Sequence, residues 1–556
     1  MDSLMNTTAL PPETLGPPAP ALPTAALDAE PSLAQRSDPA YYFDRGNLLF
    51  ADEKYNEAIA AFRRTIELRP DFAEAHNNLG MALSRIGDPA AAAACYIRTL
   101  QLAPGHAPAH NNLGCALILL GELAAAIHHY KQAITLDPER SSAYTNLVLA
   151  LQYVPGVSSA LIAETTRRWA ATVRRRPRRT PWPNLPILER RLRIGYVSGD
   201  FRRHPVAYFT ESVLAAHDRA AVEVFCYSNV ATPDEITDRI AVGADHWQSI
   251  SALEDGEAAR LIASDEIDIL VDLSGHTGAN RLTLFASRPA PIQCTWLGYA
   301  GTTGLPEIDY IIGDRFVLPP EEAQLCTEQP FRLPNSYLCF TPPESEIAVT
   351  TLPALGGGRL TFGCFNNLLK LNNSVVALWS ALLAAVPNSQ LFLKTAQLIN
   401  PDICDRLEGQ FAAHGIAADR LILSPSSPRE ELLRAYNHID IALDPFPFGG
   451  GTTTIEALWM GVPVVTLRGT RFVGHVGESI LETLGLPGLV AADPSDYLAK
   501  AVRLASALPE LAALRQQLRD RLLGSPLCDA RRFARDLEAG YRAMWEAWCR
   551  ARQIAA

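Results

Sequence analysis

The chain has 556 residues, which is too long for a single hydrophobic core and predicts several structural units. Hydrophobic residues make up 48% and charged residues 20%, and the formal net charge of -11 argues against a general nucleic-acid binder. No apolar run reaches the length that spans a bilayer, and the N-terminus lacks a signal-peptide pattern, so we expect a cytoplasmic protein without membrane contacts.

Residues 1–38 are rich in Pro, Ala and Thr and have no hydrophobic periodicity. We expect this segment to be disordered, because it cannot bury enough apolar surface to offset the entropy lost on ordering.

From residue 39 onward, four kinds of residue recur every 34 positions. This period is typical of tetratricopeptide repeats, which are helical hairpins that close with a proline after the second helix. The recurring residues are Gly46, Gly80 and Gly114; Ala58, Ala92 and Ala126; Phe62, Tyr96 and Tyr130; and Pro70, Pro104 and Pro138. We predict an α-helical solenoid of these repeats over residues 39–176, with a fourth unit that starts at Ser141 and continues in a helix over 158–174.

Asn78, Asn112 and Asn146 follow the same period of 34. A row of side-chain amides can hydrogen-bond the backbone of an extended peptide, so these residues are candidates for a peptide-binding groove. Alternatively, they cap or brace neighbouring repeats. The spacing leaves both interpretations open.

A linker is expected over residues 177–190, and the adjoining basic run, residues 174–179, is interpreted as solvated. Beyond it, short apolar runs alternate with amphipathic helical patterns in two series, over 191–345 and 355–525, and a helix is expected over 526–556. The runs lie at 193–198, 222–227 and 267–272, and then at 360–365, 390–393, 420–423, 439–443 and 462–466. Such runs are typical of buried parallel strands, so we predict two Rossmann-like, doubly wound α/β domains that bind ligands at the carboxyl ends of their strands.

The sequence FGGGTTTIEALW, residues 448–459, follows a predicted strand and enters a helix expected over 454–460. A helix start carries free N–H groups and partial positive charge, and glycines let a phosphate come close to the backbone. Glu456 is placed to hydrogen-bond a ribose diol. The segment is neither a Walker A loop nor a dinucleotide fingerprint. The alternative interpretation is a glycine-rich turn with a threonine N-cap.

One further polar residue of interest follows the first strand of each series: His204 in the first and Lys370 in the second. Lys370 would offset the negative charge that grows on a departing diphosphate. His204 could serve as a general base or hold a sugar hydroxyl. The ten cysteines form no C-x-x-C pair and no zinc-type cluster, and no D-x-D pair occurs, so no metal site is predicted.

These motifs resemble the O-GlcNAc transferase and SPINDLY protein glycosyltransferases of glycosyltransferase family 41. In that family, tetratricopeptide repeats precede a GT-B region made of two Rossmann-like domains. The resemblance covers about residues 39–550. Besides the repeats, it rests on residues 288–293 (RPAPIQ), 296–304 (WLGYAGTTG), 365–370 (FNNLLK) and 450–461.

The resemblance implies roles for individual residues. His204 matches the active-site histidine, as a base or as a sugar-positioning group, and Lys370 matches the essential phosphate-contacting lysine. The residues matching the nucleotide-sugar site are Asn367, which lines the nucleotide; Arg429, at the base; Gly450, Gly451, Thr452 and Thr453, at the diphosphate; Glu456, at the ribose; and Leu297 and Gly298, on the sugar side. The family transfers the sugar with inversion to Ser or Thr of polypeptides held along the repeat groove, and it needs no metal or other cofactor.

The sequence departs from the O-GlcNAc transferase branch at Gly451, where that branch has a histidine, and it lacks the long insertion of the animal enzymes between Phe340 and Gly358. The residues 446–448 (FPF), 276–277 (HT), 524–528 (GSPLC) and 541–549 look nearer to SPINDLY, which uses GDP-fucose. We therefore expect UDP-GlcNAc as the donor, with GDP-fucose as a close alternative and UDP-glucose also open. Two other functions fit the pattern: a repeat scaffold with an inactive transferase region, and a small-molecule glycosyltransferase.

Overall fold

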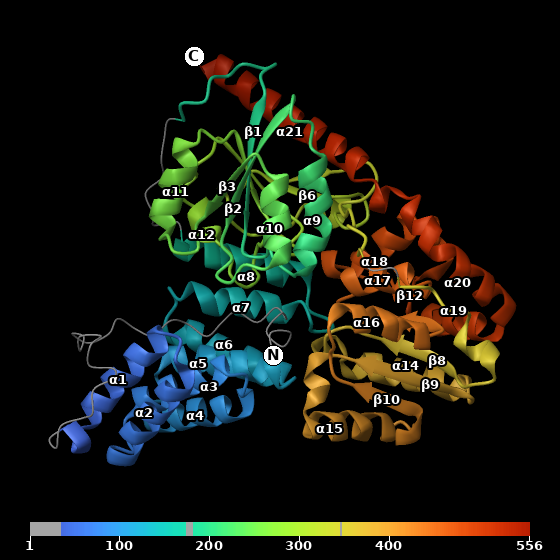
Figure 1. The fold of residues 1–556 in the computed structure, drawn as a ribbon, viewed down its shortest axis with the longest axis horizontal. Coiled ribbons are helices and arrows are strands. Elements are labelled where there is room, and N and C mark those ends of the chain that lie inside the picture. Colours follow the sequence, from blue (N-terminus) through green and yellow to red (C-terminus); the bar gives the residue numbers. More distant parts are fainter. Residues whose placement is uncertain (1–34, 174–181, 345–346, 556) are drawn as a thin grey trace. The chain divides into compact units, whose positions relative to one another are not determined.

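A computed structural model describes residues 35–173, 182–344 and 347–555 (Figure 1). The chain divides into two compact units, Met1–Ala150 and Leu151–Ala556. The basic run at 174–179 and almost all of the segment expected to be disordered lie outside the described residues. Among the described residues, no helix is both long enough and apolar enough to span a membrane.

The first unit is built from helical hairpins, which confirms the predicted repeats (Figure 1). Its helices are α1 (Pro39–Ala51), α2 (Tyr55–Leu68), α3 (Ala73–Arg85), α4 (Pro89–Leu102), α5 (Ala107–Leu119), α6 (Leu123–Leu136) and most of α7 (Ser141–Leu151). The recurring glycine and aromatic residue pack on each other in every hairpin. A Cβ atom at Gly80 would lie 2.7 Å from the Tyr96 ring, so the glycine lets the two helices approach.

The periodic asparagines are buried and join neighbouring repeats. The amide nitrogens of Asn78, Asn112 and Asn146 donate to the side-chain oxygens of Asn47, Asn77 and Asn111, at 2.9, 3.3 and 2.9 Å. Asn112 is only 1% exposed. These bonds are the bracing contacts of the second interpretation. Each of them uses one of the two N–H groups of its amide.

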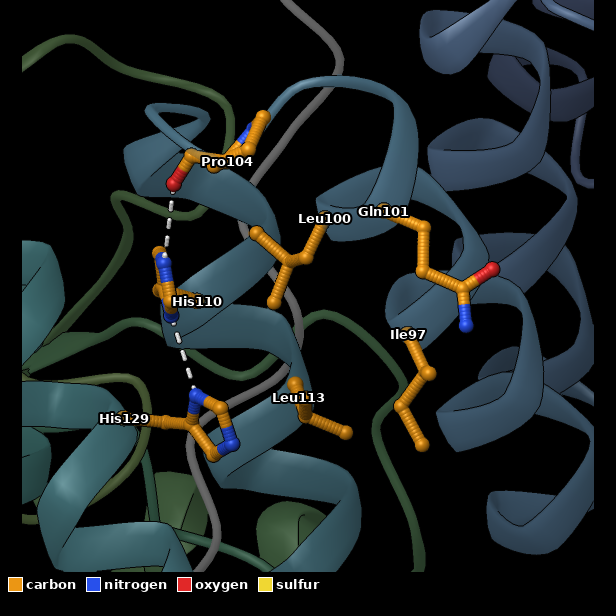
Figure 2. Close-up of a pocket in the computed structure, with 7 residues that line it drawn as sticks. All are labelled: Ile97, Leu100, Gln101, Pro104, His110, Leu113 and His129. Carbon is orange, nitrogen blue, oxygen red and sulfur yellow. Dashed lines mark hydrogen bonds between the residues drawn. The ribbon is translucent and has the colours of Figure 1, made fainter.

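A cavity of about 410 Å³ opens on the repeats and holds a pair of histidines (Figure 2). The Nε2 atom of His110 lies 3.2 Å from the Pro104 carbonyl oxygen, which can only accept, so Nε2 carries the proton. His129 therefore donates from Nδ1 to Nδ1 of His110, 2.9 Å away. The remaining lining residues are Ile97, Leu100, Gln101 and Leu113. Burial and the neighbouring His110 and His128 lower the pKa of His129 to about 4.

The second unit begins with the end of α7 and α8 (Ser159–Val173) and contains two lobes, each with a fully parallel sheet (Figure 1). The first sheet has the strand order β3-β2-β1-β4-β5-β6-β7, and the second β10-β9-β8-β11-β12-β13. This arrangement confirms the two predicted Rossmann-like domains.

The first lobe contains β1 (Leu192–Ser198), α9 (Pro205–Ala216), β2 (Val222–Ser228), α10 (Glu235–Gly243), β3 (His246–Ser249), α11 (Asp255–Ser264), β4 (Ile269–Asp272), α12 (Leu282–Phe285), β5 (Ile292–Trp296), β6 (Tyr310–Gly313), α13 (Pro320–Ala323) and β7 (Gln329–Arg332). The second contains β8 (Leu360–Cys364), α14 (Asn373–Ala385), β9 (Ser389–Lys394), α15 (Pro401–Ala412), β10 (Leu421–Ser424), α16 (Arg429–Ala435), β11 (Ile441–Leu443), α17 (Thr452–Trp459), β12 (Val464–Leu467), α18 (Phe472–Thr483), β13 (Val490–Ala491), α19 (Pro494–Ser506) and α20 (Leu508–Leu523). All eight predicted strands are present, and β3, β5, β6, β7 and β13 were not predicted.

Both sheets reverse their strand order at one point, between β1 and β4 in the first and between β8 and β11 in the second. The connections on either side of such a point diverge, which leaves room for a ligand at the carboxyl ends of the two strands. The segments after β1 and β8 carry His204 and Lys370, and the segment after β11 carries the glycines and threonines.

The last helix, α21 (Ala530–Ala555), returns from the second lobe and packs on α9 and β5 of the first (Figure 1). The Tyr541 hydroxyl lies 3.1 Å from that of Tyr196, and Glu538 Oε1 lies 2.7 Å from Nδ1 of His217. The lobes are therefore connected twice, by α21 and by the segment between β7 and β8.

Acid should destabilise the repeats through the histidine pair. An unfolded histidine has a pKa of about 6.5, whereas the folded pKa of His129 is about 4. Between these values the unfolded chain binds more protons, so the free energy of unfolding falls as the pH drops through this window. His129→Phe removes this titration. Its melting temperature, followed by circular dichroism of the full chain, should fall less than that of the wild type between about pH 7 and pH 5. Equal falls would show that the pair contributes nothing.

Candidate functional site

Lys370 lies at the point where the second sheet reverses its order. Its ammonium group donates to Asn366 Oδ1 at 2.9 Å and to the Gly449 carbonyl oxygen at 2.7 Å. Burial lowers the pKa of Lys370 to about 8, and the nearby carboxylate of Asp444 partly opposes this shift. The site therefore holds a cation at neutral pH that loses its charge in mild alkali.

The glycine and threonine segment is fixed by Asp444, which directly follows β11. This buried carboxylate accepts the Gly450 N–H at 2.6 Å and the Thr466 hydroxyl at 2.8 Å. The Thr453 hydroxyl donates to Asn366 Oδ1 at 3.0 Å, so Asn366 links the threonines to Lys370. The predicted lysine and threonines thus come together at one place.

α17 begins at Thr452, two residues earlier than predicted, with Gly451 as its N-cap. Thr452 and Thr453 therefore form its first turn, where backbone N–H groups have no partner inside the helix. No side chain caps this end of the helix. The first turn of α17 can thus offer backbone donors and partial positive charge to an anion.

The two glycines of this turn differ in the space around them. A Cβ atom at Gly450 would lie 2.5 to 2.7 Å from oxygens of Thr454, Thr453 and Asp444. A Cβ atom at Gly451 would meet only Val476, at an ordinary 3.5 Å. Gly450 is required by close packing, whereas Gly451 leaves open space at the end of the helix.

Arg429 and Glu456, predicted to contact a base and a ribose, contact each other. Arg429 Nε donates to Glu456 Oε1 at 3.1 Å. Burial raises the pKa of Glu456, and the Arg429 charge opposes this shift. The guanidinium carbon also lies 3.6 Å from the centre of the Tyr208 ring, on α9 of the first lobe. This stacked contact joins the two lobes beside the site.

Asn367 is occupied within its own loop. Its Oδ1 atom accepts from the Leu369 N–H and from Gln397 Nε2, both at 3.0 Å. The residue therefore shapes the turn that leads to Lys370.

His204 is the N-cap of α9 at the carboxyl end of β1. Its Nδ1 atom accepts the Val206 N–H at 3.3 Å and lies 3.5 Å from Asp200 Oδ1. Burial lowers the pKa of His204 below its usual range, so the ring is neutral at pH 7. Because Nδ1 accepts the backbone N–H, the proton of the neutral ring lies on Nε2, which acts as a donor.

Leu297 and Gly298 follow β5 in the first lobe. Leu297 has a φ of 75°, a backbone conformation that residues other than glycine rarely adopt. A Cβ atom at Gly298 would lie 2.1 Å from the Leu273 carbonyl oxygen, so this position requires glycine. Such strained backbone often occurs in functional loops. Neither His204 nor Leu297 is hydrogen-bonded to the Lys370 group within the described residues.

Residues 172–341 and 343–537 match the profile of glycosyl transferase family 41, and residues 46–87 and 71–139 match tetratricopeptide repeat profiles. The chain belongs to glycosyl transferase family 41. Among the described residues, no three His, Cys, Asp or Glu side chains gather where they could hold a metal ion.

Several family 41 proteins are similar over much of the chain. SPINDLY of Solanum lycopersicum and of Arabidopsis thaliana, each described as a probable UDP-N-acetylglucosamine-peptide N-acetylglucosaminyltransferase, are 40% identical over 72% of this chain and 44% of their own length. SEC of Arabidopsis thaliana, with the same description, is 35% identical over 66% of this chain and 38% of its own. The chain thus spans less than half the length of these curated relatives.

The solved structure of an O-GlcNAc transferase is also similar to this chain. It is a lysine-to-methionine mutant of the Thermobaculum terrenum O-GlcNAc transferase, which is 37% identical to this chain. The match has a TM-score of 0.86 and covers 95% of this chain and 100% of the other. The repeats and both lobes of this family 41 protein are thus included in one structural match.

Four residues of the site were missed by the sequence reasoning. Asp444 and Asn366 adjoin residues that were singled out, and their positions at strand ends could have indicated them. The ring of Tyr208 contacts Arg429, and the ring of Phe448 contacts Lys370. Both partners are distant in the sequence, and no local pattern predicts such contacts.

The two glycines provide a matched test of the site. Gly450→Ala should destabilise the protein by roughly 1 to 3 kcal/mol, because its methyl group overpacks three oxygens, and it should abolish nucleotide binding. Gly451→Ala should keep the wild-type melting temperature and still bind nucleotide. Thermal denaturation and calorimetric titration with UDP and GDP would measure both effects. Equal behaviour of the two variants would contradict this account of the turn.

The pH dependence of donor use should report the charge of Lys370. With a pKa of about 8, the free enzyme loses its cation above that pH, so kcat/KM for the donor should fall about tenfold per pH unit there. Lys370→Arg would keep its charge and should lose this alkaline limb. A flat wild-type profile between about pH 7 and pH 9.5 would show that the charge is not needed.

Proposed function

We propose that this protein is an inverting protein O-glycosyltransferase that moves a sugar from a nucleoside diphosphate sugar to Ser or Thr hydroxyls. The observation that carries the proposal is the Lys370 ammonium group beside the first turn of α17, at the point where the second sheet reverses its order. The site places a cation, hydroxyls and free backbone donors together, a combination suited to a diphosphate.

The reaction needs charge stabilisation at the leaving group. The acceptor oxygen attacks the anomeric carbon, while the bond to the diphosphate breaks and its electron pair stays on the phosphate oxygen. The proton of the acceptor hydroxyl passes to an oxygen of the departing diphosphate or to water. Lys370 faces the charge that grows there, which lowers the barrier more than it strengthens ground-state binding.

His204 fits a positioning role better than that of a base. Its Nε2 carries the proton when Nδ1 accepts the Val206 N–H. In this tautomer the atom away from the helix can donate to a sugar hydroxyl but cannot take a proton from the acceptor. Leu297 and Gly298 supply the sugar side of the same lobe, and Arg429 with Glu456 the nucleoside side of the other.

UDP-GlcNAc is the proposed donor, with GDP-fucose as the alternative. The descriptions of the SPINDLY and SEC relatives and of the solved enzyme support a GlcNAc donor. The open space at Gly451 is compatible with either donor.

Polypeptides are the proposed acceptors, and the repeats are the proposed surface for them. Repeat solenoids commonly bind extended partners. Asn78, Asn112 and Asn146 each donate a hydrogen bond to the neighbouring repeat, and the proposal does not depend on whether they also contact the peptide.

The donor can be identified by thermal denaturation with UDP-GlcNAc, UDP-glucose and GDP-fucose. A ligand that binds only the folded state stabilises it by about 2.7 kcal/mol at a hundredfold excess over its dissociation constant. The true donor should raise the melting temperature most and should also label a Ser/Thr-rich protein acceptor. Labelling of small acceptors alone would indicate a small-molecule glycosyltransferase, and no response to any donor would indicate a scaffold.

Lys370→Met tests the assignment of the lysine. The variant should remain folded but melt at a lower temperature, because the buried Asp444 carboxylate loses its opposite charge. Its turnover should fall about 100- to 1,000-fold, the usual effect of removing one group that stabilises developing negative charge. Retained turnover would overturn the catalytic role of Lys370.

A further inference from the structure

An aromatic ring lies against the Lys370 ammonium group. The Nζ atom is 4.3 Å from the centre of the ring of Phe448, which lies three residues before Gly451, the N-cap of α17. The face of an aromatic ring carries partial negative charge and attracts a cation, most strongly where water is excluded. Phe448 thus contributes to the stability of the charged lysine, beyond its hydrogen bonds to Asn366 and Gly449.

Phe448 is in turn packed by Tyr153, from a distant part of the sequence. The two ring centres are 4.9 Å apart and the rings are tilted by 31°. Tyr153 is 3% exposed and lies two residues after Leu151, the last residue of α7. Its ring limits where the Phe448 ring can lie.

The segment that carries Tyr153 is held from both lobes. Arg471, just before α18, donates to the carbonyl oxygens of Leu151 and Val154, both at 3.1 Å. Gln152 donates to the Tyr299 hydroxyl at 2.8 Å, in the loop after β5. Residues 151–154 are therefore anchored on each side of Tyr153, so its ring is a fixed support.

We propose that Tyr153 is a positioning residue for transfer: it holds the Phe448 ring against the ammonium group of Lys370 and so keeps the lysine charged. The inference rests on the proposed function of Lys370. The other charged group that determines this charge is the Asp444 carboxylate after β11, which favours the protonated lysine, whereas the Cys364 thiol at the end of β8 has its pKa raised to about 12 by burial and stays neutral. Neither is changed in the variants below.

The five lysines of the chain make the charge of Lys370 directly measurable. Reductive methylation with ¹³C-formaldehyde labels each lysine, Lys370→Met identifies its signal, and the pH dependence of that signal gives the pKa in the full chain without any donor. Phe448→Leu and Tyr153→Leu should each lower this pKa by about one pH unit, the amount expected for loss of a buried cation–aromatic contact. Tyr153→Phe keeps the ring and should keep the pKa.

Phe411→Leu is the matched control, because Phe411 is a fully buried ring of α15 in the same lobe. It should lower the melting temperature without changing the pKa of Lys370. If a general loss of packing lowered the pKa of Lys370, that pKa would fall alike in all three leucine variants. The proposal requires the pKa to fall in Tyr153→Leu and to stay unchanged in Phe411→Leu.

Kinetics separate this inference from the proposed function. With the pKa moved from about 8 to about 7, kcat/KM at pH 7.5 should fall about threefold in Tyr153→Leu, and the alkaline limb should move to lower pH. An unchanged lysine pKa in Tyr153→Leu and Phe448→Leu would overturn the inference even if the enzyme transfers sugar. A lowered pKa in a protein that uses no donor would support the inference and overturn the proposed function.

Discussion

A cation that is largely removed from water sets the requirements of the whole site. Burying a charge is costly unless opposite charge and hydrogen-bond acceptors accompany it. Asp444 supplies the charge, and Asn366 and the Gly449 carbonyl supply the acceptors. The same carboxylate holds the Gly450 N–H, so the start of α17 and the lysine are placed by one group. If the start of α17 or the lysine moved away, the buried Asp444 carboxylate would lose one of the groups that pair with it.

Much of the architecture could be predicted because its causes are local. The glycine and aromatic residue that pack together recur every 34 residues, and an apolar run without alternation indicates a strand covered on both faces. Lys370 and the threonines follow β8 and β11, which are neighbours in the sheet, so topology alone brings them together. The edge strands β3 and β7 were missed because they are partly exposed and carry polar residues.

Contacts between distant segments could not be predicted from the sequence. A period of 34 fits buried and groove-facing asparagines equally well, and the bonds from Asn112 to Asn77 and from Asn146 to Asn111 become visible only in the structure. The bond between Glu456 and Arg429, which come from different helices, could not be read from the sequence either. Tyr153 and Phe448 are nearly 300 positions apart, and neither lies in a pattern that announces the other.

The return of α21 to the first lobe has a mechanical consequence. Two lobes joined by a single connection can rotate about it in any direction. With two separate connections, the easiest rotation is about the line that passes through both connections. The segment after β7 and the helix α21 form such a pair, so the lobes can turn about one axis while other rotations strain a connection. Side-chain contacts between the lobes, such as Tyr208 with Arg429 and Asp314 with Ser479, restrain that rotation in addition to the two connections.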